Sequence, residues 1–69
     1  MRAKDLIRYA ESRGWYFVRR GGRSSHAIFE HHDYPYQVVI PVHGGKDMTK
    51  RLLGQLLKQI DGTWKGPIG

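Results

Sequence analysis

Apolar residues recur at helical spacing at both ends of this chain, and the segment between them has the pattern of β-strands. The first stripe predicts a helix over residues 3–13 and consists of Ala3, Leu6, Ile7 and Ala10. The second predicts a helix over residues 49–60 and consists of Met48, Leu52, Leu53, Leu56, Leu57 and Ile60. Gly14 is expected to end the first helix, and Thr49, or alternatively Asp47, to cap the second. Each helix therefore needs a partner for one apolar face.

Three strands are expected between the helices. Residues 15–20 are aromatic and β-branched, residues 25–31 alternate, and residues 36–42 contain a continuous apolar run. Glycine-rich residues 21–24 and residues 32–35, with Pro35 ending the second strand, are the expected turns. In the second strand His26, Ile28 and Glu30 should share one face, and Ala27, Phe29 and His31 the other.

The order helix, three strands, helix predicts an α+β fold. A three-stranded antiparallel sheet with both helices on one face satisfies the apolar stripes, and this αβββα arrangement is that of double-stranded-RNA-binding domains. Residues 1–61 are expected to form the domain and residues 62–69 a C-terminal tail, in which Trp64 and Ile68 are candidates for docking. Trp15, Phe17 and Phe29 are the expected core aromatics. The tyrosines at the strand edges are expected to be partly buried, with base stacking as the alternative, and they are Tyr16, Tyr34 and Tyr36.

Composition limits the environment and the partners. The 69 residues include no cysteine, so disulfides and cysteine-bound zinc are excluded. No apolar run approaches the roughly 18 residues of a membrane helix, and the polar start is unlike a signal peptide, so we expect a cytoplasmic protein with no membrane partner. Twelve Lys and Arg against six Asp and Glu give a net charge of +6, which favours a polyanionic partner such as RNA. Solubility alone is the alternative explanation of this charge.

The stretch from Arg19 to His26 carries the most chemistry. Glycines allow backbone N–H groups to approach an anion, and arginines bind phosphate through two parallel hydrogen bonds. A histidine beside phosphate is suited to acid–base work near neutral pH. The alternative is a basic hairpin turn followed by an ordinary strand histidine. The candidate RNA-binding residues are Arg20, Gly22, Arg23, Ser25 and Lys46.

Four short segments occur in the order and at nearly the spacing of a known family. They resemble the HicA-type toxins, small mRNA-cleaving proteins of bacterial type II toxin–antitoxin pairs, over residues 4 to about 60. Arg23 and Ser24 intervene where the family usually has a closer Gly-Ser-His, and Val42 stands where members often carry His. The segments are Lys4-Asp5-Leu6-Ile7 with Gly14-Trp15, Arg23-Ser24-Ser25-His26-Ala27-Ile28-Phe29, Val38-Val39-Ile40-Pro41-Val42-His43-Gly44-Gly45-Lys46-Asp47, and Leu57-Lys58-Gln59.

The resemblance implies a catalytic histidine at His26 and a HicB-type antitoxin that covers the active face. RNA cleavage needs no metal when the 2′-hydroxyl is the nucleophile, so we expect no metal and no cofactor. Arg20, Arg23 and Lys46 are candidates to stabilise the developing charge. His43 is the candidate second proton carrier, and an exposed loop histidine is the alternative for it.

Other interpretations stay open. The chain has four histidines within 18 residues, but His31 and His32 are adjacent and would face opposite sides of a strand, so solvated turn histidines are favoured over a metal site. A non-catalytic RNA-binding module is the main alternative function. A protein-interaction domain whose basic face meets an acidic partner is the third hypothesis.

Overall fold

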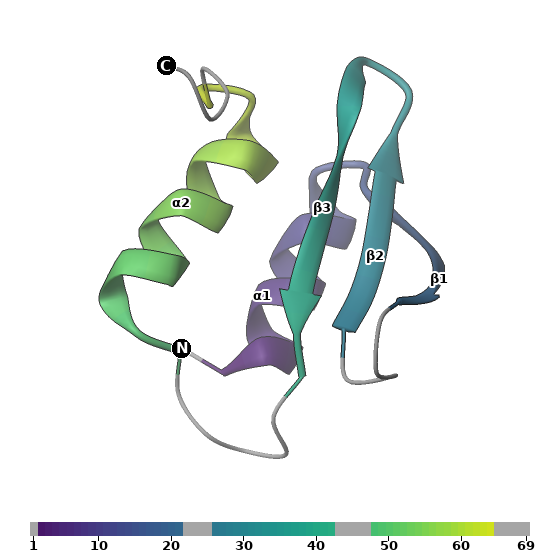
Figure 1. The fold of residues 1–69 in the computed structure, drawn as a ribbon. Coiled ribbons are helices and arrows are strands. Elements are labelled where there is room, and N and C mark those ends of the chain that lie inside the picture. The colour runs from purple at the N-terminus through teal and green to yellow at the C-terminus, as the bar shows by residue number, and fades with distance from the viewer. Residues whose placement is uncertain (1, 22–25, 43–47, 65–69) are drawn as a thin grey trace.

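The structure, a computed structural model, describes residues 2–21, 26–42 and 48–64 and confirms the predicted α+β fold (Figure 1). Three antiparallel strands form one sheet in the order β1-β2-β3. Both helices pack against β3, and side chains of both helices share one core with the sheet. The elements are α1 (Ala3–Ser12), β1 (Tyr16–Gly21), β2 (His26–His31), β3 (Tyr34–Pro41) and α2 (Lys50–Asp61).

The helix ends form where the sequence predicts them. Thr49 is the N-cap of α2, and its side chain accepts a hydrogen bond of 3.2 Å from the backbone N–H of Leu52. The rival cap, Asp47, lies outside the described residues. Gly14 follows the C-cap of α1 with a φ of 96°, a left-handed conformation that favours glycine. Met48 lies just before the cap and still packs against the core.

The core is a single cluster between the sheet and the two helices. Trp15 is 2% exposed, and its indole N–H donates a hydrogen bond of 3.0 Å to the Ile60 carbonyl at the end of α2. One side chain therefore ties the start of β1 to the last helix. The other fully buried large side chains of the cluster are Leu6, Phe29, Val38, Ile40 and Ile60.

Two predictions about strand residues are wrong. Phe17 is 51% exposed rather than part of the core, because the helices lie mainly over β3 and leave the outer strand β1 uncovered. Tyr34 and Pro35 belong to β3 and not to the turn, which consists of His32 and Asp33. Proline is tolerated there because β3 is an edge strand, where a missing N–H costs no ladder hydrogen bond.

The segment after α2 is packed as far as the structure describes it. The backbone N–H groups of Thr63 and Trp64 both donate to the Lys58 carbonyl, at 2.9 and 3.1 Å. The Trp64 ring meets Tyr36 edge-on, with the ring centres 4.9 Å apart. Of the two docking places that the sequence leaves open for Trp64, the body of the domain and a partner, the structure shows contact with the body, whereas Ile68 lies outside the described residues.

Gly54→Ala should stabilise the protein by about 0.5–1 kcal/mol. Glycine in a helix interior loses more backbone entropy on folding than alanine, and no atom lies within 4 Å of where the new methyl would sit. Such a gain raises the Tm of a domain of this size by roughly 4–8 °C per kcal/mol. Thermal unfolding followed by circular dichroism measures it, and an unchanged or lower Tm would show that the methyl group is not accommodated.

Tyr36→Phe should lose less of its free energy of unfolding at alkaline pH than the wild type does. Burial, and secondly the charge of Tyr34, raise the pKa of Tyr36 above 10.0, and its neutral hydroxyl donates a 2.7 Å hydrogen bond to the Gln59 carbonyl. Because the fold holds the neutral form, this stability is complete below pH 10 and is lost as pH rises through the higher pKa of the folded state. The hydrogen bond to Asp61 also raises the pKa of Tyr9, so part of the loss should remain.

Urea unfolding of wild type and Tyr36→Phe at pH 7, 9 and 10.5 tests this. At pH 7 the variant should be less stable than the wild type by about 1 kcal/mol, the typical net contribution of one hydrogen bond. Between pH 9 and 10.5 it should lose less free energy of unfolding than the wild type. Tyr16→Phe is the control, because Tyr16 is half exposed. If wild type and Tyr36→Phe lost the same free energy of unfolding between pH 9 and 10.5, the prediction would be contradicted.

Candidate active site

His26 is the first residue of the central strand β2 and is half-buried. Its cross-strand neighbours are Gly21 of β1 and Pro41 of β3. Neither neighbour carries a long side chain, so no bulky cross-strand side chain stands beside the imidazole. No described residue makes a hydrogen bond to the ring. Within the described residues, both ring nitrogens are therefore available to a ligand.

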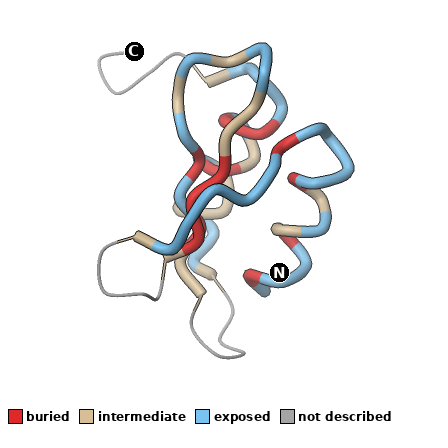
Figure 2. Tube along the Cα trace, turned by 90° about the vertical axis from the view of Figure 1, so that its right-hand side faces the viewer, coloured by how far each residue is buried: buried red, intermediate tan, exposed pale blue. Residues whose placement is uncertain are grey.

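His26 lies on the face of the sheet away from the helices. Ala27 and Phe29 belong to the core, so the alternation along β2 puts His26, Ile28 and Glu30 on the other side, as the sequence predicts. We call this side of the sheet the open face. Figure 2 shows the buried residues concentrated inside and β1 as an exposed segment at the surface. The cross-strand partners that share the open face are Tyr16, Arg19 and Gly21 of β1 and Val39 and Pro41 of β3.

Gly21 has a packing reason to be glycine. The end of the Ile28 side chain occupies the place where a Cβ on residue 21 would lie. Ile28 therefore leans across β1 and is only 7% exposed, although it belongs to the open face. This contact makes the sheet surface next to His26 apolar.

A β-bulge decides which arginine shares the open face with His26. The pairing of β1 with β2 shifts between Phe17 and Arg19, so Arg19 lies opposite Ile28 and Arg20 lies opposite Ala27. Arg19 is thus on the open face, diagonal to His26 at a backbone separation of about 7–8 Å. Arg20 is exposed and on the side of the helices. The sequence predicts Arg20 as a candidate and does not reveal the bulge, without which Arg20 would lie opposite His26.

Charge is unevenly distributed along the open face. Arg19 and His26 lie toward one end of the sheet, and Glu30 lies at the other end of β2, where the Gln37 side chain donates a 2.8 Å hydrogen bond to it. An anion is therefore attracted to the end that carries His26 and repelled from the end that carries Glu30.

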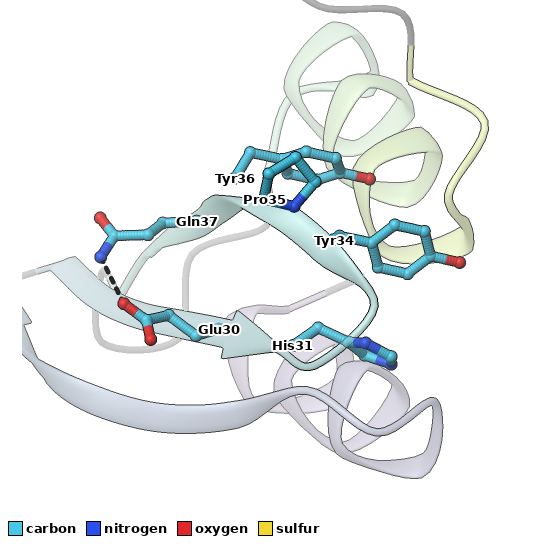
Figure 3. A pocket seen from close by; sticks show the side chains of 6 residues that line it. All are labelled: Glu30, His31, Tyr34, Pro35, Tyr36 and Gln37. Carbon is cyan, nitrogen blue, oxygen red and sulfur yellow. Dashed lines mark hydrogen bonds between the residues drawn. The ribbon is translucent and has the colours of Figure 1, made fainter.

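A pocket of about 500 Å³ opens at the hairpin between β2 and β3, at the end of β2 remote from His26 (Figure 3). Several of its polar groups already have partners within the protein: Glu30 is bound to Gln37, Tyr36 donates to Gln59, and both nitrogens of His31 are engaged. These bonds hold the hairpin together beside the pocket. Its lining residues are Glu30, His31, Tyr34, Pro35, Tyr36 and Gln37.

His31 is a structural histidine rather than a solvated one, so that prediction is wrong for this residue. Its Nδ1 accepts a 3.0 Å hydrogen bond from the Asp33 N–H, which leaves Nε2 to donate at 2.9 Å to the Arg13 carbonyl. The ring also packs on Trp15 and Tyr34, with centres 5.1 and 4.8 Å apart. His32 is exposed in the turn, as expected.

Several predicted site residues lie outside the described residues. Residues 22–25 follow Gly21 and precede His26, and residues 43–47 follow β3 after Val42. Gly21 and Pro41, the strand partners of His26, each lie within two residues of one of these segments. The predicted residues outside the described part are Gly22, Arg23, Ser25, His43 and Lys46.

Within residues 2–21, 26–42 and 48–64, no group of three or more His, Asp or Glu is arranged to hold a metal ion. Over the same part of the chain, no helix is long and apolar enough to cross a membrane.

A model of a known protein family matches most of the chain. The family model described as HicA toxin of bacterial toxin-antitoxin matches residues 3–61, which is most of the chain and includes all five described elements. No curated protein and no solved structure matches the chain.

Proposed function

Because the chain belongs to the HicA toxin family of bacterial toxin–antitoxin systems, we propose that it is an endoribonuclease that cleaves mRNA through a single catalytic histidine, His26. The family makes the protein a toxin with an antitoxin partner. We further propose that cleavage needs no metal ion, that the antitoxin is of the HicB type and covers the open face, and that both proteins act in the cytoplasm.

The position of His26 is the observation that carries this proposal. A half-buried imidazole on an open sheet face, between a glycine and a proline and without a bond to any described residue, can approach a phosphodiester. Of the three described histidines, it is the one that combines the family's segment with this accessibility, since His31 is engaged and His32 is on the remote turn.

The chemistry follows from the groups near His26. Neutral imidazole removes the proton of the ribose 2′-hydroxyl, the 2′-oxygen forms a bond to phosphorus, and the bond from phosphorus to the 5′-oxygen breaks. The 5′-oxygen takes a proton either back from the protonated His26 or from His43, our candidate for a second proton carrier. General acid–base catalysis of this kind contributes typically 10²–10⁴-fold to a rate.

Positive charge would stabilise the phosphorane that forms in this step. Arg19 is the described cation on the same face as His26. Arg23 and Lys46 remain candidates in the flanking segments, with Gly22 and Ser25 as backbone or hydroxyl donors to phosphate. Arg20 remains a candidate for binding more distant phosphates, because its strand position faces the other side of the sheet.

Expression in a bacterial host tests the proposal. Induction of the wild type should stop growth and produce cut transcripts that primer extension detects, and induction of His26→Ala at equal protein level should do neither. Growth arrest with intact transcripts would refute a nuclease. Binding of RNA without cleavage by the purified wild type would instead favour an RNA-binding module.

A further inference from the structure

The outer edge of β1 is available for an additional strand. β1 is hydrogen-bonded to β2 on one side only, because the sheet order is β1-β2-β3 (Figure 1). All of its residues from Tyr16 to Arg20 are exposed. An edge strand presents a row of backbone N–H and C=O groups that another extended chain can pair with. No strand of the described chain pairs with this edge.

An added strand would cover exposed apolar side chains on both faces of β1. Tyr16 is 50% exposed on the open face, and Phe17 is 51% exposed on the helix side, where its ring meets Phe29 of the core edge-on at 5.9 Å. Val18, at the bulge, is 37% exposed. A strand added at this edge would cover apolar surface on both faces at once, which a flat ligand on one face cannot do.

The two edges of the sheet differ in how they are protected. The opposite edge strand, β3, contains Pro35 and Pro41, and Trp64 packs on its Tyr36. Proline is a common means of preventing strand addition. β1 contains no proline, and its only protective features are the bulge and the charges of Arg19 and Arg20.

Those two charges select the partner. A second copy of this chain pairing through the same strand would bring four arginines, two from each chain, into one short ribbon, where like charges destabilise the pairing. An acidic strand would instead set a carboxylate beside the exposed Arg19 guanidinium. Glu30, the one carboxylate of the described strands, is opposite Tyr16 and already bound to Gln37.

We propose that the outer edge of β1 is the docking site for an extended, acidic segment of a partner protein, which joins the sheet as a fourth strand. Backbone pairing along Tyr16–Gly21 supplies the affinity, and Arg19 requires a carboxylate on the incoming strand. The antitoxin that the family implies is the first protein in which to look for such a segment. The inference does not depend on catalysis by His26.

Binding of synthetic peptides to the full chain tests this proposal without a cleavage assay. The probes are two capped ten-residue peptides in which glutamate alternates with valine and threonine, with the glutamates at odd or at even positions. Hydrogen exchange followed by NMR should show at least one of them slowing the exchange of β1 amides by tenfold or more, with little change in α2. The same peptides with lysine in place of glutamate should not bind.

Charge-matched variants separate a specific site from general attraction. Arg19→Glu should weaken peptide binding at least fivefold, and Arg19→Lys should retain most of it. Arg8→Glu on the exposed surface of α1 changes the net charge equally and should leave binding within twofold. Amide spectra of the free variants check that each is folded.

Several results would overturn the proposal. These are equal weakening by Arg8→Glu and Arg19→Glu, protection confined to residues outside β1, or no binding of either glutamate peptide at millimolar concentration. Dimerisation of the chain with protected β1 amides would assign the edge to a second copy instead. Loss of cleavage in His26→Ala with peptide binding intact would leave the proposal standing, so the two proposals fail separately.

Discussion

His26→Ala should fold as the wild type does and lose RNA cleavage by about 10²–10⁴-fold. The side chain is half-buried at the end of a strand, belongs to the open face and not to the core, and has no hydrogen bond to a described residue. Its removal therefore takes away little packing, while an acid–base step would lose its proton carrier. Single-turnover cleavage rates, circular dichroism and RNA binding, measured together, check the three parts of this expectation.

His32→Ala is the matched control for that variant. His32 is an exposed histidine in the turn at the other end of β2, so its replacement removes the same side chain from another place in the same protein. Its cleavage rate should stay within about twofold of wild type. Equal losses in the two variants would mean that the effect is one of general charge, and would contradict a catalytic role for His26.

Trp15→Ala should lower the free energy of unfolding by about 3–5 kcal/mol. The indole is 2% exposed, its N–H is bonded to the end of α2 at Ile60, and its ring contacts Tyr34, stacked at 5.7 Å between ring centres. A domain of this size rarely has more than about 3–5 kcal/mol from its core. The variant should therefore be largely unfolded at 25 °C.

Far-ultraviolet circular dichroism and urea titration measure this loss. Trp64→Ala is the control, because Trp64 is a half-buried tryptophan that contacts Tyr36 from outside the main core. Its cost should be well below that of Trp15→Ala. A Trp15→Ala protein with a cooperative transition near that of wild type would contradict the core described above.

The sequence was a good guide where a local pattern determines the structure. Helical spacing located both helices, and threonine before the apolar stripe gave the cap of α2 that the structure has. Strict alternation in 26–31 put His26 and Glu30 on the open face because β2 has no inserted residue. These features depend on residues within a few positions of each other.

Features that depend on pairing between strands were missed. The bulge in β1 inserts one residue, which exchanges the faces of Arg19 and Arg20, and no residue type in 15–20 marks its position. Phe17 has the composition of a core residue, but its strand lies beyond the reach of the helices. The role of His31 arises from the carbonyl of Arg13, 18 residues away, so adjacent sequence could not show it.

The most direct test of the central claim is cleavage of a mixed-sequence RNA in EDTA by wild type and His26→Ala. Circular dichroism first checks that both preparations are folded to the same extent. We predict that the wild type cuts and leaves 2′,3′-cyclic phosphate ends, or the phosphate ends formed by their hydrolysis, and that His26→Ala does not cut. Full cleavage by His26→Ala, or wild-type cleavage that appears only when a divalent metal is added, would contradict a metal-independent ribonuclease that depends on His26.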